Sequence, residues 1–209
     1  MRNLLVGAFL AGAAVSASAQ QLPEPPGYFG VGYGISRYHD FCAGGAGNCD
    51  ESDRAVRVEA GYMFRPWLGL EGAFIHFGQA TQPGFLLNPP PNTTPLPSAG
   101  EGRTQAFALS ALLRAPLGAV GLHAKVGWAA VTASFSGNAA VRNNTTGVVT
   151  NFSSRARESS GHLIYGLGAT FDVTPQWHAR FDWDRTKAKD NINPKYEVDA
   201  YTLGIGYRF

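Results

Sequence analysis

Ten charged residues stand at alternate positions of otherwise apolar segments, five of them basic and five acidic. They are Arg57, Glu59, Glu71, Arg114, Lys125, Asp172, Arg180, Asp182, Asp184 and Arg208. A selective pore favours a ring of one sign. A balanced set favours mutual pairing, because a buried ion without a partner costs several kcal/mol. We therefore predict an internal ion-pair network, which either fills a lumen statically or acts as a gate whose pairs exchange and briefly open a water path.

The N-terminal segment has the features of a secretory signal. Arg2 precedes an apolar run of 12 residues, and an Ala-Ser-Ala cleavage site ends at residue 19. The run is shorter than the roughly 20 residues that a membrane-spanning helix needs. We expect residues 1–19 to be a cleaved signal peptide, 20–27 a short N-terminal lead and 28–209 the exported domain.

Two cysteines enclose a glycine-rich hexapeptide. In an exported protein, Cys42 and Cys49 are expected to form a local disulfide. The alternative is a metal site that adds His39, Asp40 and Asp50 to the two thiols. The spacing of six residues is not a recognised zinc pattern, so we expect the disulfide, with no metal and no cofactor.

The composition excludes several classes of protein. A formal charge of +2 leaves no electrostatic footprint for nucleic acid. Hydrophobic residues make up 44% of the chain, which excludes disorder. Beyond the N-terminal segment, glycine or a charge interrupts every apolar stretch, which excludes a helical membrane protein.

The hydrophobic pattern has a period of two, as in β-strands. In the first segment Phe29, Val31, Tyr33 and Ile35 alternate with glycine and serine. The same alternation defines eight segments, at about residues 29–36, 56–64, 68–75, 107–114, 122–129, 162–172, 177–184 and 201–209. An even number of antiparallel strands can close into a barrel without an open edge.

The connections between these segments alternate in length. Short links lie near residues 65–66, 116–119 and 173–176. Long polar links cover about 38–53, 78–103, 136–158 and 186–196. Short turns at one rim and long loops at the other are typical of outer-membrane barrels, with the turns periplasmic and the loops extracellular. We predict an all-β fold: an eight-stranded antiparallel up-and-down transmembrane β-barrel with four long extracellular loops.

The two faces of the strands differ, and their assignment decides the class of barrel. A soluble barrel, the alternative, would turn the apolar face inward. Here the charges share their face with glycines, which suit the crowded lumen of an eight-stranded barrel. Aromatic residues fall toward the strand ends, as in the two interfacial girdles of a membrane barrel. We therefore expect the apolar face to meet lipid.

These segments resemble the OmpA-like family of eight-stranded outer-membrane β-barrels. The resemblance rests on Tyr28-Phe29-Gly30-Val31-Gly32-Tyr33-Gly34, Leu70-Glu71-Gly72, Leu122-His123-Ala124-Lys125-Val126-Gly127, Tyr165-Gly166-Leu167-Gly168, Ala179-Arg180-Phe181-Asp182 and the C-terminal segment from Tyr201 to Phe209. It covers essentially the whole predicted mature chain. Many relatives continue into a peptidoglycan-binding domain; this sequence stops at Phe209, so cell-wall tethering is not expected.

The resemblance has consequences for sites and partners. It implies a gate-like network that includes Glu59, Glu71, Lys125 and Arg180. The terminal pattern with Tyr207 and Phe209 resembles the signal read by the barrel-assembly machinery. The expected partners are therefore that machinery, periplasmic chaperones, outer-membrane lipid with lipopolysaccharide, and a host or surface ligand at the loops.

Three functions fit such a barrel. The leading expectation is a non-enzymatic outer-membrane protein that supports envelope integrity and uses its loops for surface interaction or adhesion. A narrow gated ion channel is a second possibility. The third is an enzyme acting on acyl chains of lipid A or phospholipids, with Glu158, Ser160 and His162 on one face of a strand. By parity these three point inward, and no oxyanion donor is identifiable, so we expect no enzyme.

Overall fold

The computed structural model describes residues 26–39, 50–83, 90–189 and 196–209, which contain nine β-strands. The strands are β1 (Gly27–His39), β2 (Ser52–Arg65), β3 (Leu68–Pro83), β4 (Thr93–Pro95), β5 (Ala99–Leu117), β6 (Val120–Asn143), β7 (Val149–Asp172), β8 (Trp177–Ala188) and β9 (Tyr196–Arg208). None of the described segments is a helix long and apolar enough to cross a membrane.

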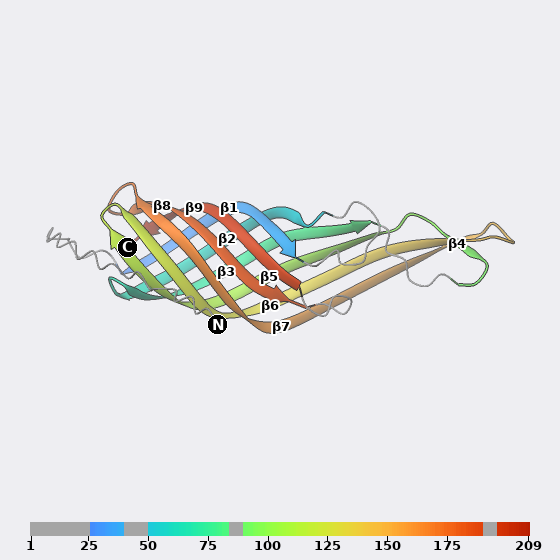
Figure 1. Ribbon diagram of the computed structural model, residues 1–209, viewed down its shortest axis with the longest axis horizontal. Coiled ribbons are helices and arrows are strands. Elements are labelled where there is room, and N and C mark those ends of the chain that lie inside the picture. Colours follow the sequence, from blue (N-terminus) through green and yellow to red (C-terminus); the bar gives the residue numbers. More distant parts are fainter. Residues whose placement is uncertain (1–25, 40–49, 84–89, 190–195) are drawn as a thin grey trace, which may run out of the picture.

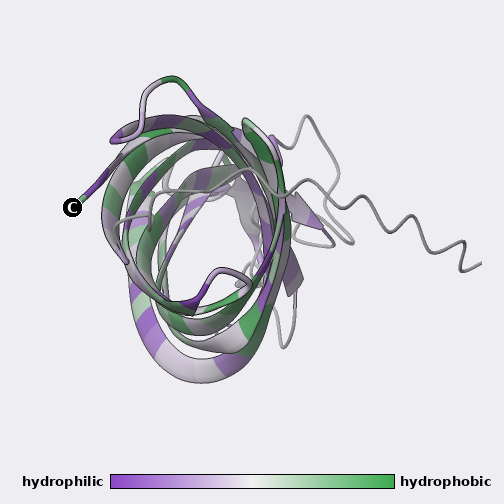
Figure 2. Ribbon diagram, turned by 90° about the vertical axis from the view of Figure 1, so that its left-hand side faces the viewer, coloured by the Kyte–Doolittle hydropathy of each residue, from purple (hydrophilic) through white to green (hydrophobic). Residues whose placement is uncertain are grey.

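Eight of the strands form a closed ring, seen end-on in Figure 2. β1 pairs with both β2 and β9, and β6 pairs with both β5 and β7. Register partners can be followed around the ring in both directions from Val31 on β1. Through β2, β3 and β5 they lead to Ala130 on β6, and through β9, β8 and β7 they lead to Val120 on the same strand. The paths meet ten residues apart (130 − 120 = 10). Such a stagger tilts the strands by roughly 40°. The predicted up-and-down barrel is confirmed.

The assignment of the two faces is also confirmed. Outward residues on opposite sides of the ring are exposed, with Phe29 on β1 at 51% and Trp128 on β6 at 61% of their full surface. Inward charges are buried, with Arg57 and Glu71 both at 1%. Because the outer wall is apolar and the ions are enclosed, the barrel suits a lipid surround and not an aqueous one.

Four strands run well beyond the ring and form a projecting sheet (Figure 1). We use this name for the ends of β3, β5, β6 and β7 together with β4. β6 and β7 are 24 residues each and pair continuously from Val120–Phe171 to Arg142–Val149. β8 pairs with β7 only between Ile164 and Asp172. β4 joins β6 near the tip of the sheet.

The projecting sheet corrects two of the predicted loops. Residues 136–158 were expected to form a loop, but they are a β-hairpin with its turn between Asn143 and Val149. The expected loop 78–103 contains the end of β3, all of β4 and the start of β5. The alternation is weak there because both faces of the sheet lie outside the lipid belt. On β6 one face is still buried, with Phe135 at 3% and Val141 at 9% exposure, whereas residues 149–155 of β7 are exposed on both faces and are held by backbone pairing with β6.

Several sequence predictions lie outside the described residues. They include the signal peptide, most of the N-terminal lead, and the residues Cys42 and Cys49 of the predicted disulfide. The alternative metal site lies partly there as well, since Asp40 is in the same gap.

A β-bulge marks the point where β3 leaves the ring. The pairing of β3 with β5 shifts between His76 and Gln79, and Gly78 has a φ of 69°. This left-handed conformation favours glycine. The carboxylate of Asp53 accepts a hydrogen bond from the Gln79 backbone N–H at 2.7 Å, which fixes the bulge to β2.

Candidate functional site

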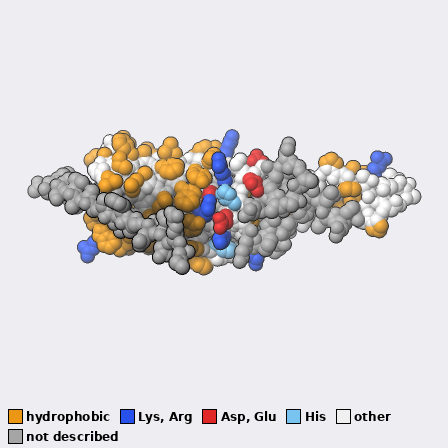
Figure 3. Space-filling view, viewed as in Figure 1, with side chains coloured by type: hydrophobic (Ala, Val, Ile, Leu, Met, Phe, Trp, Pro, Cys, Tyr) orange, Lys and Arg blue, Asp and Glu red, His pale blue; other side chains and the backbone are white. Residues whose placement is uncertain are grey.

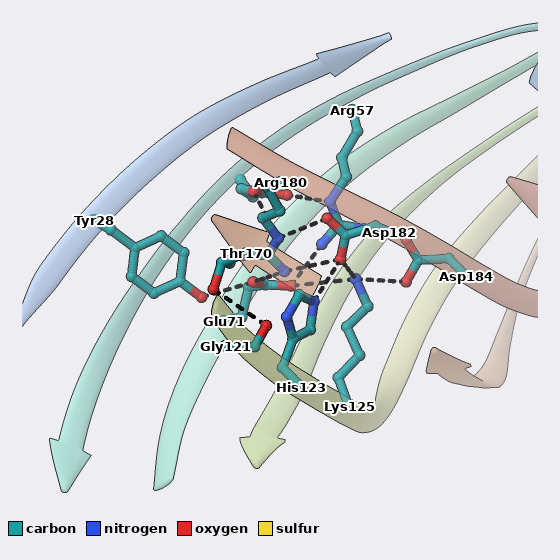
Figure 4. A network of polar contacts seen from close by, with 11 residues as sticks. Tyr28, Arg57, Glu71, Gly121, His123, Lys125, Thr170, Arg180, Asp182 and Asp184 are labelled. Carbon is teal, nitrogen blue, oxygen red and sulfur yellow. Dashed lines mark hydrogen bonds and ion pairs between the residues drawn. The ribbon is translucent and has the colours of Figure 1, made fainter. Parts of the chain in front are cut away.

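The inward side chains form the candidate site, and its centre is a network of seven charged residues, which we call the ionic layer (Figure 4). Its members are Arg57, Glu59, Glu71, Lys125, Arg180, Asp182 and Asp184. They come from β2, β3, β6 and β8. The alternation of each strand turns these side chains toward the barrel axis.

Each cation of the ionic layer contacts three carboxylates. Arg57 donates to Glu59, to Asp184 and, at 2.5 Å, to Glu71.

Arg180 lies 2.6 Å from both Glu71 and Asp182, and 3.2 Å from Glu59.

Lys125 reaches Asp182 at 2.6 Å, Asp184 at 2.9 Å and Glu71 at 3.6 Å. The contacts are therefore shared, and no single pair can open without disturbing the others.

Two further polar side chains, those of Tyr28 and His123, complete the ionic layer, and both escaped the sequence analysis. Three cations face four carboxylates in the ionic layer (3 − 4 = −1). The Tyr28 hydroxyl donates to Glu71 at 2.6 Å, and a ring nitrogen of His123 lies 3.0 Å from Asp182. Their parity with the charged positions is the signal that could have found them.

Glycines make room for these long side chains. A Cβ atom added to Gly166 would lie 2.8 Å from Asp184 Oδ1 and from Lys125 Cε, and one added to Gly30 would lie 2.9 Å from Glu59 Oε1. Both distances are shorter than real Cβ contacts. The inward glycines thus provide the space that the long side chains of the ionic layer occupy.

The remaining predicted charges lie at the rim next to the short turns. Arg208 donates to Asp172 at 2.6 Å, and Arg114 lies 3.8 Å from the other oxygen of the same carboxylate. Asp172 is the last residue of β7, Arg208 is the last residue of β9, and Arg114 lies three residues before the end of β5. The sequence set therefore divides into the ionic layer and a rim group.

The upper lumen, toward the projecting sheet, is filled by apolar side chains instead. We call these residues the apolar layer: Tyr38, Ile75, Phe77, Val131, Ile164, Tyr196 and Val198. Phe77 and Val198 have no exposed surface. The Tyr38 hydroxyl donates to the backbone oxygen of Gly78 at 3.0 Å, and the hydroxyls of Thr104 and Tyr196 lie 2.9 Å apart.

The sequence analysis missed the apolar layer because it treated the inward face as polar throughout. Ile75 and Phe77 continue the parity of Glu71 on β3, and Val131 continues the parity of Lys125 on β6. Following the inward parity to the end of each strand would have found them.

The predicted enzyme residues give a mixed result. Ser160 Oγ lies 2.8 Å from His162 Nε2, a contact that the sequence analysis did not expect. A serine hydrogen-bonded to an imidazole is the start of nucleophile activation. The Glu158 carboxylate, however, pairs with Lys189 at 3.0 Å. The arrangement therefore supplies a Ser–His pair, and the Glu158 carboxylate is engaged by Lys189.

The outer wall carries a charged band where its apolar surface ends (Figure 3). There Arg185 donates twice to Asp199, at 2.5 and 2.6 Å, and His39 Nε2 lies 3.0 Å from the same carboxylate. These contacts join β1, β8 and β9 above the apolar belt.

The C-terminal residues lie at the opposite end of the belt. The Tyr207 ring packs on Trp177, with centroids 5.0 Å apart, and on Phe29, with centroids 5.9 Å apart. Phe209 is exposed, and its backbone pairs with Gly27. The proposed assembly signal is thus part of an aromatic cluster on the lipid-facing wall.

Comparison with known proteins identifies the class. The family model described as "Outer membrane protein beta-barrel domain" matches residues 6–209. The chain belongs to this family, and it is an outer-membrane protein.

Solved structures agree with the family in fold. Neisserial surface protein A is 14% identical, with a TM-score of 0.55, over 88% of this chain and 97% of that one. OprG from Pseudomonas aeruginosa is 16% identical, with a TM-score of 0.50, over 89% and 97%. Ail, the attachment invasion locus protein of Yersinia pestis, is 21% identical, with a TM-score of 0.49, over 89% and 99%. No curated protein sequence matches the chain.

Proposed function

We propose that this protein is a closed outer-membrane barrel with neither a conducting pore nor an enzymatic activity, which stabilises the envelope and presents its projecting sheet for surface interaction. The observation that carries the proposal is the filling of the lumen by two unlike layers in series. A path for water would have to cross shared ion pairs and then a dry apolar segment.

The apolar layer argues against the gate that the sequence pattern suggested. Exchange of partners among Arg57, Lys125 and Arg180 would open only the ionic layer. Hydrophobic constrictions exclude water and ions, so the closed segment around Phe77 and Val198 remains a barrier. The ion pairs then serve to bury charges at low cost and to hold four strands in register.

The projecting sheet supports the surface role. It extends beyond the belt on β3, β5, β6 and β7, and its strands need no lipid contact. Lipopolysaccharide around the belt, and the assembly machinery during insertion, remain the partners that we infer from the charged band and the C-terminal residues.

Conductance in a planar bilayer tests the proposal. We expect no unitary current from the wild-type protein, and none from Lys125→Met, because the apolar layer is intact in both. Resolved, voltage-driven openings of the wild-type protein would overturn the closed-barrel function. Retention of the folded band on unboiled gels verifies that each sample is a closed barrel.

The dyad of Ser160 and His162 provides the test of the enzymatic alternative. Lipid A acyl patterns from cells with the wild-type protein, with Ser160→Ala and without the protein are expected to be identical. A pattern that changes with the wild-type protein and reverts in the serine variant would assign an acyl hydrolase or transferase instead.

A further inference from the structure

The outward face of the projecting sheet contains an open groove of about 480 Å3. It lies across β5, β6 and β7. Two rows of paired residues form its floor: Arg103, Ser134 and Arg157 in one row, and Glu101, Ser136 and Arg155 in the next. Neighbouring strands are about 4.8 Å apart, so Arg103 and Arg157 flank Ser134, whereas Glu101 and Arg155 flank Ser136.

The groove has an excess of positive charge with little internal compensation. Three arginines face one carboxylate, that of Glu101 (3 − 1 = +2). Arg103 donates to the side-chain oxygen of Gln79 at 3.1 Å. Among the described residues, Arg155 and Arg157 have no ion-pair partner, and both are exposed.

The arginines of the groove differ from those that carboxylates neutralise elsewhere in the protein. Arg57 and Arg180 are each surrounded by carboxylates, and Arg185 is held by Asp199. The guanidinium groups of the groove therefore retain their capacity to bind an external anion, which arginine recognises through paired hydrogen bonds.

The position and surroundings of the groove define the anion. On β7, Arg157 lies six residues and Arg155 eight residues beyond Leu163, an exposed apolar residue of the belt. At about 3.3 Å per residue, both stand well above the lipid surface. The floor offers the hydroxyl groups of Ser134 and Ser136, and its one aromatic residue, Phe135, is only 3% exposed and so presents little surface to anchor a protein partner.

We propose that the groove of Arg103, Arg155 and Arg157 binds a sulfated glycan outside the cell. Sulfate groups would accept hydrogen bonds from the arginines, and sugar hydroxyls would face Ser134 and Ser136. This inference rests on the proposed function and narrows its surface interaction to one chemical class and one face of the projecting sheet.

Binding of a size-defined heparin oligosaccharide to the protein in phosphatidylcholine nanodiscs tests the proposal. We expect saturable binding by the wild-type protein, and affinity at least about tenfold weaker for the double variant R155S/R157S. The matched control is R142S, which removes an exposed arginine of the same sheet outside the groove. It is expected to change the affinity less than twofold.

Three outcomes would overturn the inference. The first is no binding by the wild-type protein. The second is an equal loss in R142S, which would mean general charge attraction. The third is a double variant that loses retention of lipopolysaccharide from mixed vesicles while still binding the oligosaccharide, which would assign the groove to the surrounding membrane. A folded, non-conducting protein in these cases leaves the proposed function intact, whereas unitary currents would reject that function alone.

Discussion

The two layers of the lumen solve the same packing problem with opposite chemistry. In the ionic layer, three cations and four carboxylates lie near mid-height and saturate one another. In the apolar layer, aliphatic and aromatic side chains exclude water without any net charge. The difference teaches that buried charge alone does not identify a pore: the layer in series with it decides whether ions can pass.

The two layers also respond differently to the loss of one side chain. A missing ion leaves its partners buried without compensation, and this cost is larger than the net worth of the pair. A missing apolar group leaves a cavity, whose cost depends on how far the neighbours relax. Three substitutions make this comparison quantitative.

Arg57→Leu is expected to have the largest effect. It removes one of the two or three cations that Glu59, Glu71 and Asp184 each contact and leaves two cations facing four buried carboxylates, so we expect a loss of about 3–5 kcal/mol in the free energy of unfolding. Urea unfolding in lipid bilayers, followed by tryptophan fluorescence and by heat-modifiable gel mobility, measures it. The control is Arg65→Leu at the exposed end of β2, which is expected to change stability by less than about 0.5 kcal/mol. Equal stability of the two variants would mean that the ion pairs do not hold the barrel.

Phe77→Ala tests the apolar layer. Phe77 has no exposed surface and packs at the centre of the layer, so we expect a loss of about 3 kcal/mol. The same variant tests whether the apolar layer blocks the passage of water and ions, because a cavity in this layer shortens the hydrophobic barrier. Brief currents in planar bilayers from Phe77→Ala, absent in Arg65→Leu, would locate the barrier here. A stability equal to that of the wild-type protein would contradict the tight packing of this layer.

Tyr28→Phe has the smallest expected effect. The substitution removes one hydroxyl that donates to Glu71 at 2.6 Å and leaves all three cations in place. We expect a loss of about 1.5–2 kcal/mol by the same unfolding measurement, at the lower end of what a hydrogen bond to a charged group contributes. A loss as large as that of Arg57→Leu would show that the ionic layer depends on its neutral donor and not on shared charge.

The sequence predicted the site only in part. Parity assigned Glu71, Lys125 and Arg180 to the interior because each is next in sequence to an aliphatic residue that faces the lipid. It could not state that Arg57 meets Asp184, since these residues are 127 positions apart and lie on strands that are not adjacent in the ring. The contact of Ser160 with His162 was missed for a related reason, because rotamers, and not spacing, bring the two side chains within 2.8 Å.

The sequence analysis also failed to predict the strands of the projecting sheet. Alternation reports a difference between two environments, and segments such as 149–158 have water on both faces. Arg155 and Arg157 therefore fell within the predicted loop 136–158, and their groove with Arg103 exists only because β5, β6 and β7 are paired in one register.

The sequence by itself determined the strand period, the lipid-facing side and hence the outer-membrane barrel, because a bilayer imposes a strict rule on every second residue. Only the tertiary structure decided the stagger of ten residues, which sets the height at which each inward side chain meets the others. That height separates the ionic layer from the apolar layer. It depends on how the whole ring closes, a property that no single strand contains.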